Sequence, residues 1–213
     1  MNILRISCSP RGQEAESHRL SQRIVEGLFE RSPNARLMDR MIGQDPVAHI
    51  DADIALAQHQ GDAGRSGHAS LLRSEALIRE VEAADILVIA TPMHNAGVPS
   101  VLKAWIDHVV RSGRTFTVGP EGKTGSLRDR PVLVAVSSGG RYSGERARQP
   151  DFLTPYLTAI LGMVGLRDLH FFSVQGTGLG EQVVALARIQ AEHGIRAYFS
   201  SLPERHPVPG ALA

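Results

Sequence analysis

Residues 85–97 read DILVIATPMHNAG, and the start of this stretch decides the fold class. Asp85 to Ala90 is almost continuously apolar, which is typical of a strand buried on both faces. The preceding segment, Leu71 to Ala84, carries apolar residues at helical spacing, namely Leu72, Leu77, Ile78 and Val81. A helix followed directly by a doubly buried strand indicates a parallel sheet covered by helices.

The same alternation extends outward along the chain in both directions. Further strands are predicted over Asn2–Ser7, Ala35–Met41, Pro131–Val136 and Asp168–Val174. Further helices are predicted over Ser17–Arg31, from Ser100 for about three turns, over Asp151–Val164 and over Glu181–Ser200. We therefore expect a doubly wound α/β fold, a three-layer sandwich whose five-stranded parallel sheet has helices on both faces and connections too long for hairpins.

The length of 213 residues suits one large domain and is too short for two ordinary domains with a linker. We expect this domain to span residues 1–202. Pro203–Ala213 is proline-rich without a periodic apolar face, so it is predicted to be a mobile tail. Gly43–Ser70 is polar and rich in Gly and His, and the one element suggested there is a short helix over Asp53–Gln58.

Composition excludes several classes of function. A net charge of +1 and 5% aromatic residues lack the basic footprint and stacking groups of a nucleic-acid binder. Cys8 is the single cysteine, so no intramolecular disulfide can form. No apolar run approaches the roughly 18 residues of a membrane span, and the start of the chain lacks a signal-peptide core. We therefore predict a cytoplasmic protein that binds neither nucleic acid nor membrane.

In sheets of this kind, ligands bind beyond the carboxyl ends of the strands, so the loops after the first, third and fourth strands are of interest. The first loop, Ser7–Gly12, offers hydroxyls and turn N–H groups, and Ser17 stands where the next helix begins. Hydroxyl donors and a helix N-terminus suit a phosphate. The alternative is that Ser17 is only an N-cap and Ser9 a turn residue.

The other two loops suit a planar ring. Met93, His94 and Asn95 lie between two prolines, a rigid edge against which a heterocycle can rest, although a lone His is often a surface or capping residue. After the fourth strand, Ser137–Gly140 lacks bulky side chains and lets the backbone approach a ring, although a glycine pair also commonly ends a strand.

Several more specific motifs are excluded because the residues that they require do not stand at the required positions. A phosphatase loop starting at Cys8 would need Arg where Glu14 stands, and the P-loop-like Gly119–Thr124 would need Gly where Thr117 stands. The glycine cluster from Gly176 lacks the third glycine of a dinucleotide fingerprint. The histidines show no metal-ligand spacing, so no metal site is predicted.

Taken in order, these segments resemble the FMN-dependent NADH azoreductases and related NAD(P)H:quinone oxidoreductases, which have a flavodoxin-like fold. The resemblance covers about residues 2 to 200. It is carried by the loop with Ser9 and Ser17 and by the segments Ile89–Asn95, Leu102–Asp107, Gly119–Gly122, Ser137–Gly140, Thr154–Leu157 and Leu161–Gly162.

The resemblance implies one FMN per subunit and assigns the residues that hold it. Its phosphate would be held by Ser9 and Ser17 with the backbone of Ala15 and Glu16. Its isoalloxazine would be lined by Pro92, Met93, His94, Asn95 and Ala96, and its pyrimidine edge by Ser137, Ser138, Gly139 and Gly140.

Two departures from the family pattern concern this site. His94 and Ala96 stand where relatives often carry Tyr and Phe, which removes aromatic bulk and reshapes the acceptor pocket. Ala15 and Glu16 stand where relatives often carry Ser and Gln. Glu16 must therefore point away from the phosphate or weaken its binding by repulsion.

The resemblance also implies the activity, a two-electron ping-pong reduction of quinones or azo compounds. NADH or NADPH gives hydride to flavin N5 and leaves before the acceptor binds. The family works as homodimers with the flavin near the interface, and Gly43–Ser70 and the helix from Ser100 are the candidate contacts.

Side chains of two kinds are candidates for a part in this reaction: hydrogen-bond donors to the flavin, and arginines that could contact the nicotinamide cofactor. Tyr142 is the first candidate to stabilise negative charge near flavin N1 and O2, with His94 second, unless Tyr142 packs on its loop. Arg141, Arg146 and Arg148 are expected to be solvated rather than to meet the phosphates of the nicotinamide cofactor.

Two other functions remain open on the sequence. One is a flavodoxin-type carrier that passes single electrons between proteins. The other is a regulatory protein of the same fold without bound FMN, which Ala15 and Glu16 would favour.

Overall fold

The computed structural model describes residues 1–52, 54–55 and 69–203. Its main sheet has five strands in the order β2-β1-β3-β6-β7, and each neighbouring pair is parallel. The strands are β1 (Asn2–Ser7), β2 (Arg36–Arg40), β3 (Ile86–Pro92), β6 (Val132–Ser138) and β7 (Leu169–Gln175). The predicted five-stranded parallel sheet is confirmed.

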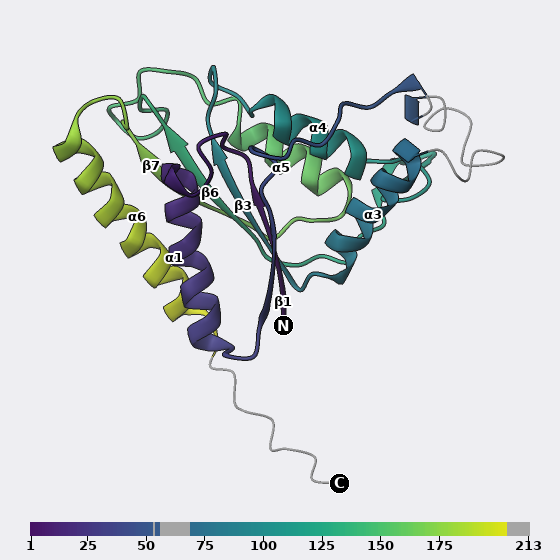
Figure 1. Cartoon of the computed structure of the whole chain (residues 1–213), viewed down its shortest axis with the longest axis horizontal. Helices are drawn as coiled ribbons and strands as arrows, with labels where there is room; N and C mark the ends of the chain where they lie inside the picture. Colours follow the sequence, from purple (N-terminus) through teal and green to yellow (C-terminus); the bar gives the residue numbers. More distant parts are fainter. Residues whose placement is uncertain (53, 56–68, 204–213) are drawn as a thin grey trace, which may run out of the picture.

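Helices cover both faces of this sheet (Figure 1). One face carries α1 (Glu16–Arg31), which follows the short 3-10 helix η1 (Gly12–Glu14), and α6 (Glu181–Ser201). The other face carries α3 (Ala69–Ala83), α4 (Ser100–Val109) and α5 (Thr154–Met163). The three predicted layers are therefore present.

The central strand β3 shows why its sequence is continuously apolar. Ile86 and Val88 pack into the core under α1 and α6, whereas Leu87 and Ile89 pack into the core under α3, α4 and α5. Successive side chains of a strand point to opposite faces, so a strand between two helical layers needs apolar residues at every position.

The core beneath α1 is interrupted by polar side chains on β1. Arg5 is buried and donates hydrogen bonds to Gln22 on α1 and to Asp39 on β2. Ser7 lies within hydrogen-bond distance of His18, with 3.0 Å between its Oγ and the ring Nδ1. Because a buried charge is tolerated only with partners, these contacts fix where α1 lies over β1 and β2.

The five strands of the main sheet are all parallel to their neighbours, so none of their connections is a hairpin, as predicted, but one connection contains a hairpin that the sequence did not indicate. β4 (Phe116–Gly119) and β5 (Gly122–Gly125) pair antiparallel as a small hairpin between α4 and β6. Its strands are four residues long, largely exposed and glycine-bearing, so they carry no alternating apolar pattern. The P-loop-like segment Gly119–Thr124 contains the turn of this hairpin.

Two predictions concern segments that are described in part or not at all. Of the short helix predicted over Asp53–Gln58, only Ile54 and Ala55 are described, and both are helical. The predicted tail lies outside the described residues from position 204 onward. In the described parts of the chain, no helix has the length and apolar composition needed to cross a membrane.

Candidate functional site

A cleft of about 650 Å³ opens at the carboxyl ends of the central strands. The parallel register places Pro92, the last residue of β3, beside Ser137 of β6, and the Met93 N–H donates to the Ser137 carbonyl over 2.7 Å. The loops predicted from the sequence therefore meet. The predicted residues that line the cleft are Ser9, Ala15, Glu16, Pro92, Met93, His94, Ser137, Ser138 and Gly139.

The first turn of α1 forms one end of the cleft. Its N-cap is Ala15, which has no side-chain acceptor for the N–H groups of the turn. Ser17 is therefore not the N-cap, and that alternative is wrong. Ser17, although predicted as a binding residue, does not line the cleft: its hydroxyl is buried and has no hydrogen-bond partner among the described residues. Free N–H groups, the helix dipole and a buried free hydroxyl together make this end suitable for a phosphate.

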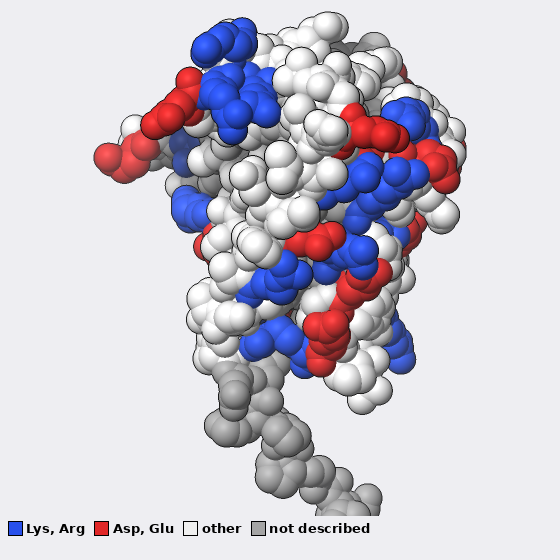
Figure 2. Space-filling view, turned by 90° about the vertical axis from the view of Figure 1, so that its left-hand side faces the viewer, with Lys and Arg blue, Asp and Glu red and all other residues white. Residues whose placement is uncertain are grey.

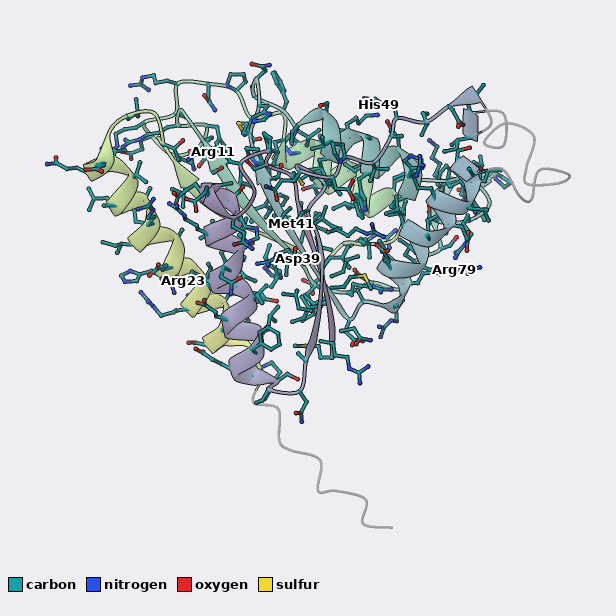
Figure 3. All side chains as sticks on the ribbon, in the orientation of Figure 1. Arg11, Arg23, Asp39, Met41, His49 and Arg79 are labelled. Carbon is teal, nitrogen blue, oxygen red and sulfur yellow. The ribbon has the colours of Figure 1, made fainter. Side chains whose placement is uncertain are left out.

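Ser9 forms a tight turn beside this helix end. The Ser9 carbonyl accepts from Gly12 N–H over 3.0 Å, and its hydroxyl accepts from Arg11 N–H over 3.3 Å. Arg11 itself lies near the start of α1 (Figure 3). The proposed turn role of Ser9 is thus seen, and its place on the cleft wall leaves the phosphate role open as a prediction.

Glu16 forms an ion pair with Arg188, a residue that the sequence did not suggest. Glu16 is the residue expected to point away from the phosphate or to repel it. Its carboxylate accepts two hydrogen bonds from Arg188 on α6, from Nε and Nη2, both of 2.7 Å. Both residues line the cleft. The acidic side chain in the first turn of α1 is therefore paired with a cation.

His94 is presented by a two-residue turn. The backbones of His94 and Gly97 exchange hydrogen bonds of 3.0 and 2.9 Å, and Asn95 and Ala96 between them have φ of 49° and 63°. This left-handed conformation suits Asn and is unusual for Ala. The exposed His94 side chain lines the cleft, whereas Asn95 and Ala96 do not.

The loop after β6 is tied to the loop after β7. Thr177 N–H donates to the Ser138 carbonyl over 3.0 Å, and Gly178 N–H donates to the Gly139 carbonyl over 3.1 Å. Gly140, predicted as a binding residue, does not line the cleft, and its carbonyl accepts from Gly176 N–H over 3.1 Å. The glycine-rich segment rejected as a dinucleotide fingerprint therefore supports this wall.

The family model for the flavodoxin-like fold matches residues 1–198. The chain belongs to this family.

Its relatives within the flavodoxin-like family carry consistent names. A Pseudomonas fluorescens protein named FMN-dependent NADH:quinone oxidoreductase 4 is 48% identical over 184 residues, covering 86% of this chain and 88% of the relative. A Cupriavidus pinatubonensis protein named FMN-dependent NADH:quinone oxidoreductase 2 is 45% identical, covering 86% and 90%.

Solved structures agree on the fold. An FMN-dependent NADH-azoreductase from Bacillus anthracis, solved in complex with FMN, superposes with a TM-score of 0.77 at 24% identity. The alignment covers 93% of this flavodoxin-like chain and 100% of the azoreductase chain.

In this flavodoxin-like chain, Tyr142 does not line the cleft. Its ring packs against the core under α4 and α5, and its N–H donates to Gln175 Oε1 over 2.9 Å. Burial raises the pKa of the Tyr142 hydroxyl above its usual value. Its role toward the flavin stays a prediction, and of the two candidate donors His94 is the one on the cleft wall.

The arginines of the same loop also lie outside the cleft. Arg141 and Arg146 line a different cavity, of about 620 Å³, between β7 and α6. That cavity has a similar volume but lies beside the edge strand rather than at the strand carboxyl ends, so the topology favours the first cleft as the cofactor site. Arg148 is exposed, and one of its guanidinium nitrogens donates to the Ala147 carbonyl over 2.8 Å.

Cys8 lies next to the site but takes no part in its surface. It is fully buried in the core, and its N–H donates to the Ala90 carbonyl over 2.8 Å. Burial raises the pKa of the Cys8 thiol strongly. Cys8 is a structural core residue, as the sequence predicted.

Proposed function

We propose that this chain is an FMN-dependent NADH:quinone oxidoreductase that also reduces azo compounds by two-electron ping-pong transfer. The observation that carries the proposal is the uncapped first turn of α1, with the buried free hydroxyl of Ser17, at one end of a cleft at the strand carboxyl ends. Relatives at 45% and 48% identity bear the same name.

FMN, when bound here, would supply the redox chemistry, the two-electron transfer from NADH or NADPH to a quinone or azo acceptor. The protein positions it. Ser9 and the first turn of α1, which line the cleft, would hold the phosphate together with the buried hydroxyl of Ser17, while Met93 and the backbone of Ser137–Gly139 would border the ring. His94 stands on the same wall, where a donor stabilises negative charge on the ring.

The homodimer and the cytoplasmic location predicted from the sequence belong to the same proposal, as does the single domain over residues 1–202. The candidate dimer contacts are Gly43–Ser70 and α4. Part of the first segment, residues 53 and 56–68, lies outside the described residues. Analytical sedimentation of the purified flavoprotein tests the homodimer. A monomer would contradict it and would exclude a site completed by a second subunit.

The test of the function is the visible absorption spectrum of freshly purified protein, repeated after anaerobic addition of NADH and then NADPH. We expect a flavin band that bleaches directly to the fully reduced form and returns on addition of a quinone. A stable semiquinone with no response to either nucleotide would favour the single-electron carrier. A colourless protein that also rejects added FMN would favour the regulatory protein and contradict the enzyme.

A further inference from the structure

We propose that Arg188 is a cofactor-positioning residue whose pairing with Glu16 permits the FMN phosphate to bind beside an acidic first turn. This inference rests on the proposed function, because it concerns the phosphate end of the same cleft. The Glu16 carboxylate stands in the first turn of α1, where an unpaired negative charge would repel the phosphate.

The pair is geometrically well defined. Two parallel hydrogen bonds of 2.7 Å join the Arg188 guanidinium to the two carboxylate oxygens of Glu16. The Glu16 side chain is 15% exposed and that of Arg188 is 46% exposed. A bidentate pair fixes both side chains more firmly than a single contact does, so Glu16 is held in one orientation by α6.

The pair also stands at a boundary between two spaces. Glu16, Arg19 and Arg188 line the cleft and also a smaller cavity of about 210 Å³ between α1 and α6. The three side chains therefore form the partition between these two spaces. Arg19 itself pairs with the exposed Glu14, at 2.7 Å.

Charge balance gives the pair its role. A phosphate monoester carries about −1.5 to −2 charges at pH 7. An unpaired carboxylate in the first turn of α1 would repel it and offset the helix dipole. Paired with Arg188, Glu16 contributes little net charge. The surface over α1 and α6 shows cations and anions interspersed rather than a patch of one sign (Figure 2).

The same two helices provide a matched control. Arg23 on α1 lies 3.5 Å from Glu192 on α6, measured from Nε to Oε1. Arg23 is about two turns further along α1 (Figure 3), and neither residue lines the cleft. Removing this pair loosens the same helix contact without changing the charge at the phosphate end.

The experiment measures FMN and riboflavin affinities of the full-length apoprotein by flavin fluorescence. The variants are Arg188→Met, Glu16→Gln, the double variant Glu16→Gln with Arg188→Met, and the control Arg23→Met. We expect Arg188→Met to weaken FMN binding at least tenfold, because Glu16 is left unpaired. The double variant should return to within threefold of wild type, and Glu16→Gln and Arg23→Met should stay within threefold. Riboflavin, which has no phosphate, should bind all five proteins alike.

Several results would overturn the inference. An Arg188→Met variant that binds FMN normally would show that the pair is irrelevant. A double variant as weak as Arg188→Met would mean that Arg188 acts without Glu16. An equal loss in Arg23→Met would mean that any α1–α6 contact has the same effect. Arg188→Gln repeats the test if the Met variant loses its cooperative thermal transition.

These outcomes are separable from failure of the proposed function. Wild-type protein that binds no FMN overturns both proposals together. Wild-type protein that binds FMN but is not reduced by NADH or NADPH overturns the enzyme proposal alone, and the affinity pattern of the variants still decides the role of Arg188.

Discussion

The two walls of the cleft differ in how they are built. The near wall comes from the loops that follow β1, β3 and β6, and the sequence predicted most of it. The far wall comes from the β7–α6 connection and α6, through Thr177, Gly180, Glu181, Val184 and Arg188, and the sequence predicted none of it. Loops at strand ends are placed by topology, whereas a helix side chain is placed only by packing.

The largest expected effect is a loss of stability when a methyl group is added to a glycine that supports the near wall, compared with one that supports the far wall. A Cβ on Gly43 would overlap the backbone of Ser9 in the near wall, and backbone there cannot yield. A Cβ on Gly178 would lie 3.3 Å from the Gly139 carbonyl oxygen, which needs only a small shift. We expect Gly43→Ala to lower the free energy of unfolding by about 3 kcal/mol, and Gly178→Ala by less than about 1 kcal/mol.

Urea unfolding of the two apoproteins measures this difference. Equal losses in both variants would mean that the near wall is no more rigidly supported than the far wall.

Beside the near wall, Ser17 is expected to contribute to FMN affinity but not to the stability of the apoprotein. Ser17→Ala removes a buried hydroxyl that has no partner among the described residues, so apoprotein stability should stay level or rise. FMN affinity should fall by about tenfold to a hundredfold, the value of about 1.5–3 kcal/mol for a hydrogen bond to a charged group.

Ser21→Ala is the matched control on the same helix. The Ser21 hydroxyl donates to the His18 carbonyl over 2.7 Å, so its loss should cost about 1 kcal/mol of stability and leave FMN binding unchanged. Fluorescence titration and urea unfolding check both variants. Normal FMN binding by Ser17→Ala would remove Ser17 from the proposed site.

Much of the near wall could be predicted because residue type and position agree there. Ser9 and Ser17 bracket the first turn after a strand, and Ser137 follows a continuously apolar run. For such residues the strand order alone determines which loops meet. The same reasoning predicted the sheet and both helical layers.

The rest depends on packing that no local pattern records. Arg188 lies 172 positions from Glu16, and helical periodicity indicates only which face of α6 is buried. Tyr142 is turned into the core by its loop, away from the cleft. The β4–β5 hairpin has too little apolar surface to produce a strand pattern.

A third, smaller effect concerns the turn that presents His94. Ala96 has a φ of 63°, a conformation that costs a non-glycine residue about 1–2 kcal/mol. Ala96→Gly relieves this cost but makes the unfolded chain more flexible, which offsets about 0.5–1 kcal/mol. We expect a net gain in stability of up to about 1 kcal/mol.

The matched control is Ala185→Gly at an exposed position of α6, which should lose about 1 kcal/mol. Thermal unfolding compares the two variants. Opposite signs are expected, and losses of the same size would show that the turn at Ala96 is not held in the left-handed conformation.

The smallest effect is a pH dependence beneath the near wall. Burial, with a contribution from the Arg5 cation, lowers the pKa of His18 below its usual 6.5, although Asp39 acts in the opposite direction. Folded His18 therefore stays neutral where the unfolded chain takes up a proton. Stability should be fully retained above about pH 6.5 and fall as pH drops below it, by at most about 1.4 kcal/mol per pH unit for one group.

Urea unfolding at pH 7.5 and 5.5 tests this with His18→Gln. The fall should be smaller in the variant but not absent, because burial also lowers the pKa of His108. His193→Gln, at an exposed position of α6, should keep the wild-type fall. A wild-type fall unchanged in His18→Gln would exclude His18 as its source.

The burial of Cys8 has a consequence for durability. Quinones are electrophiles that add to thiolates, and the thiolate is the reactive form of cysteine. The chain has one cysteine, its sulfur is shielded from solvent, and burial keeps it protonated. As the quinone reductase proposed above, the chain therefore offers its substrates no thiolate, so arylation of Cys8 is not expected to shorten its working lifetime.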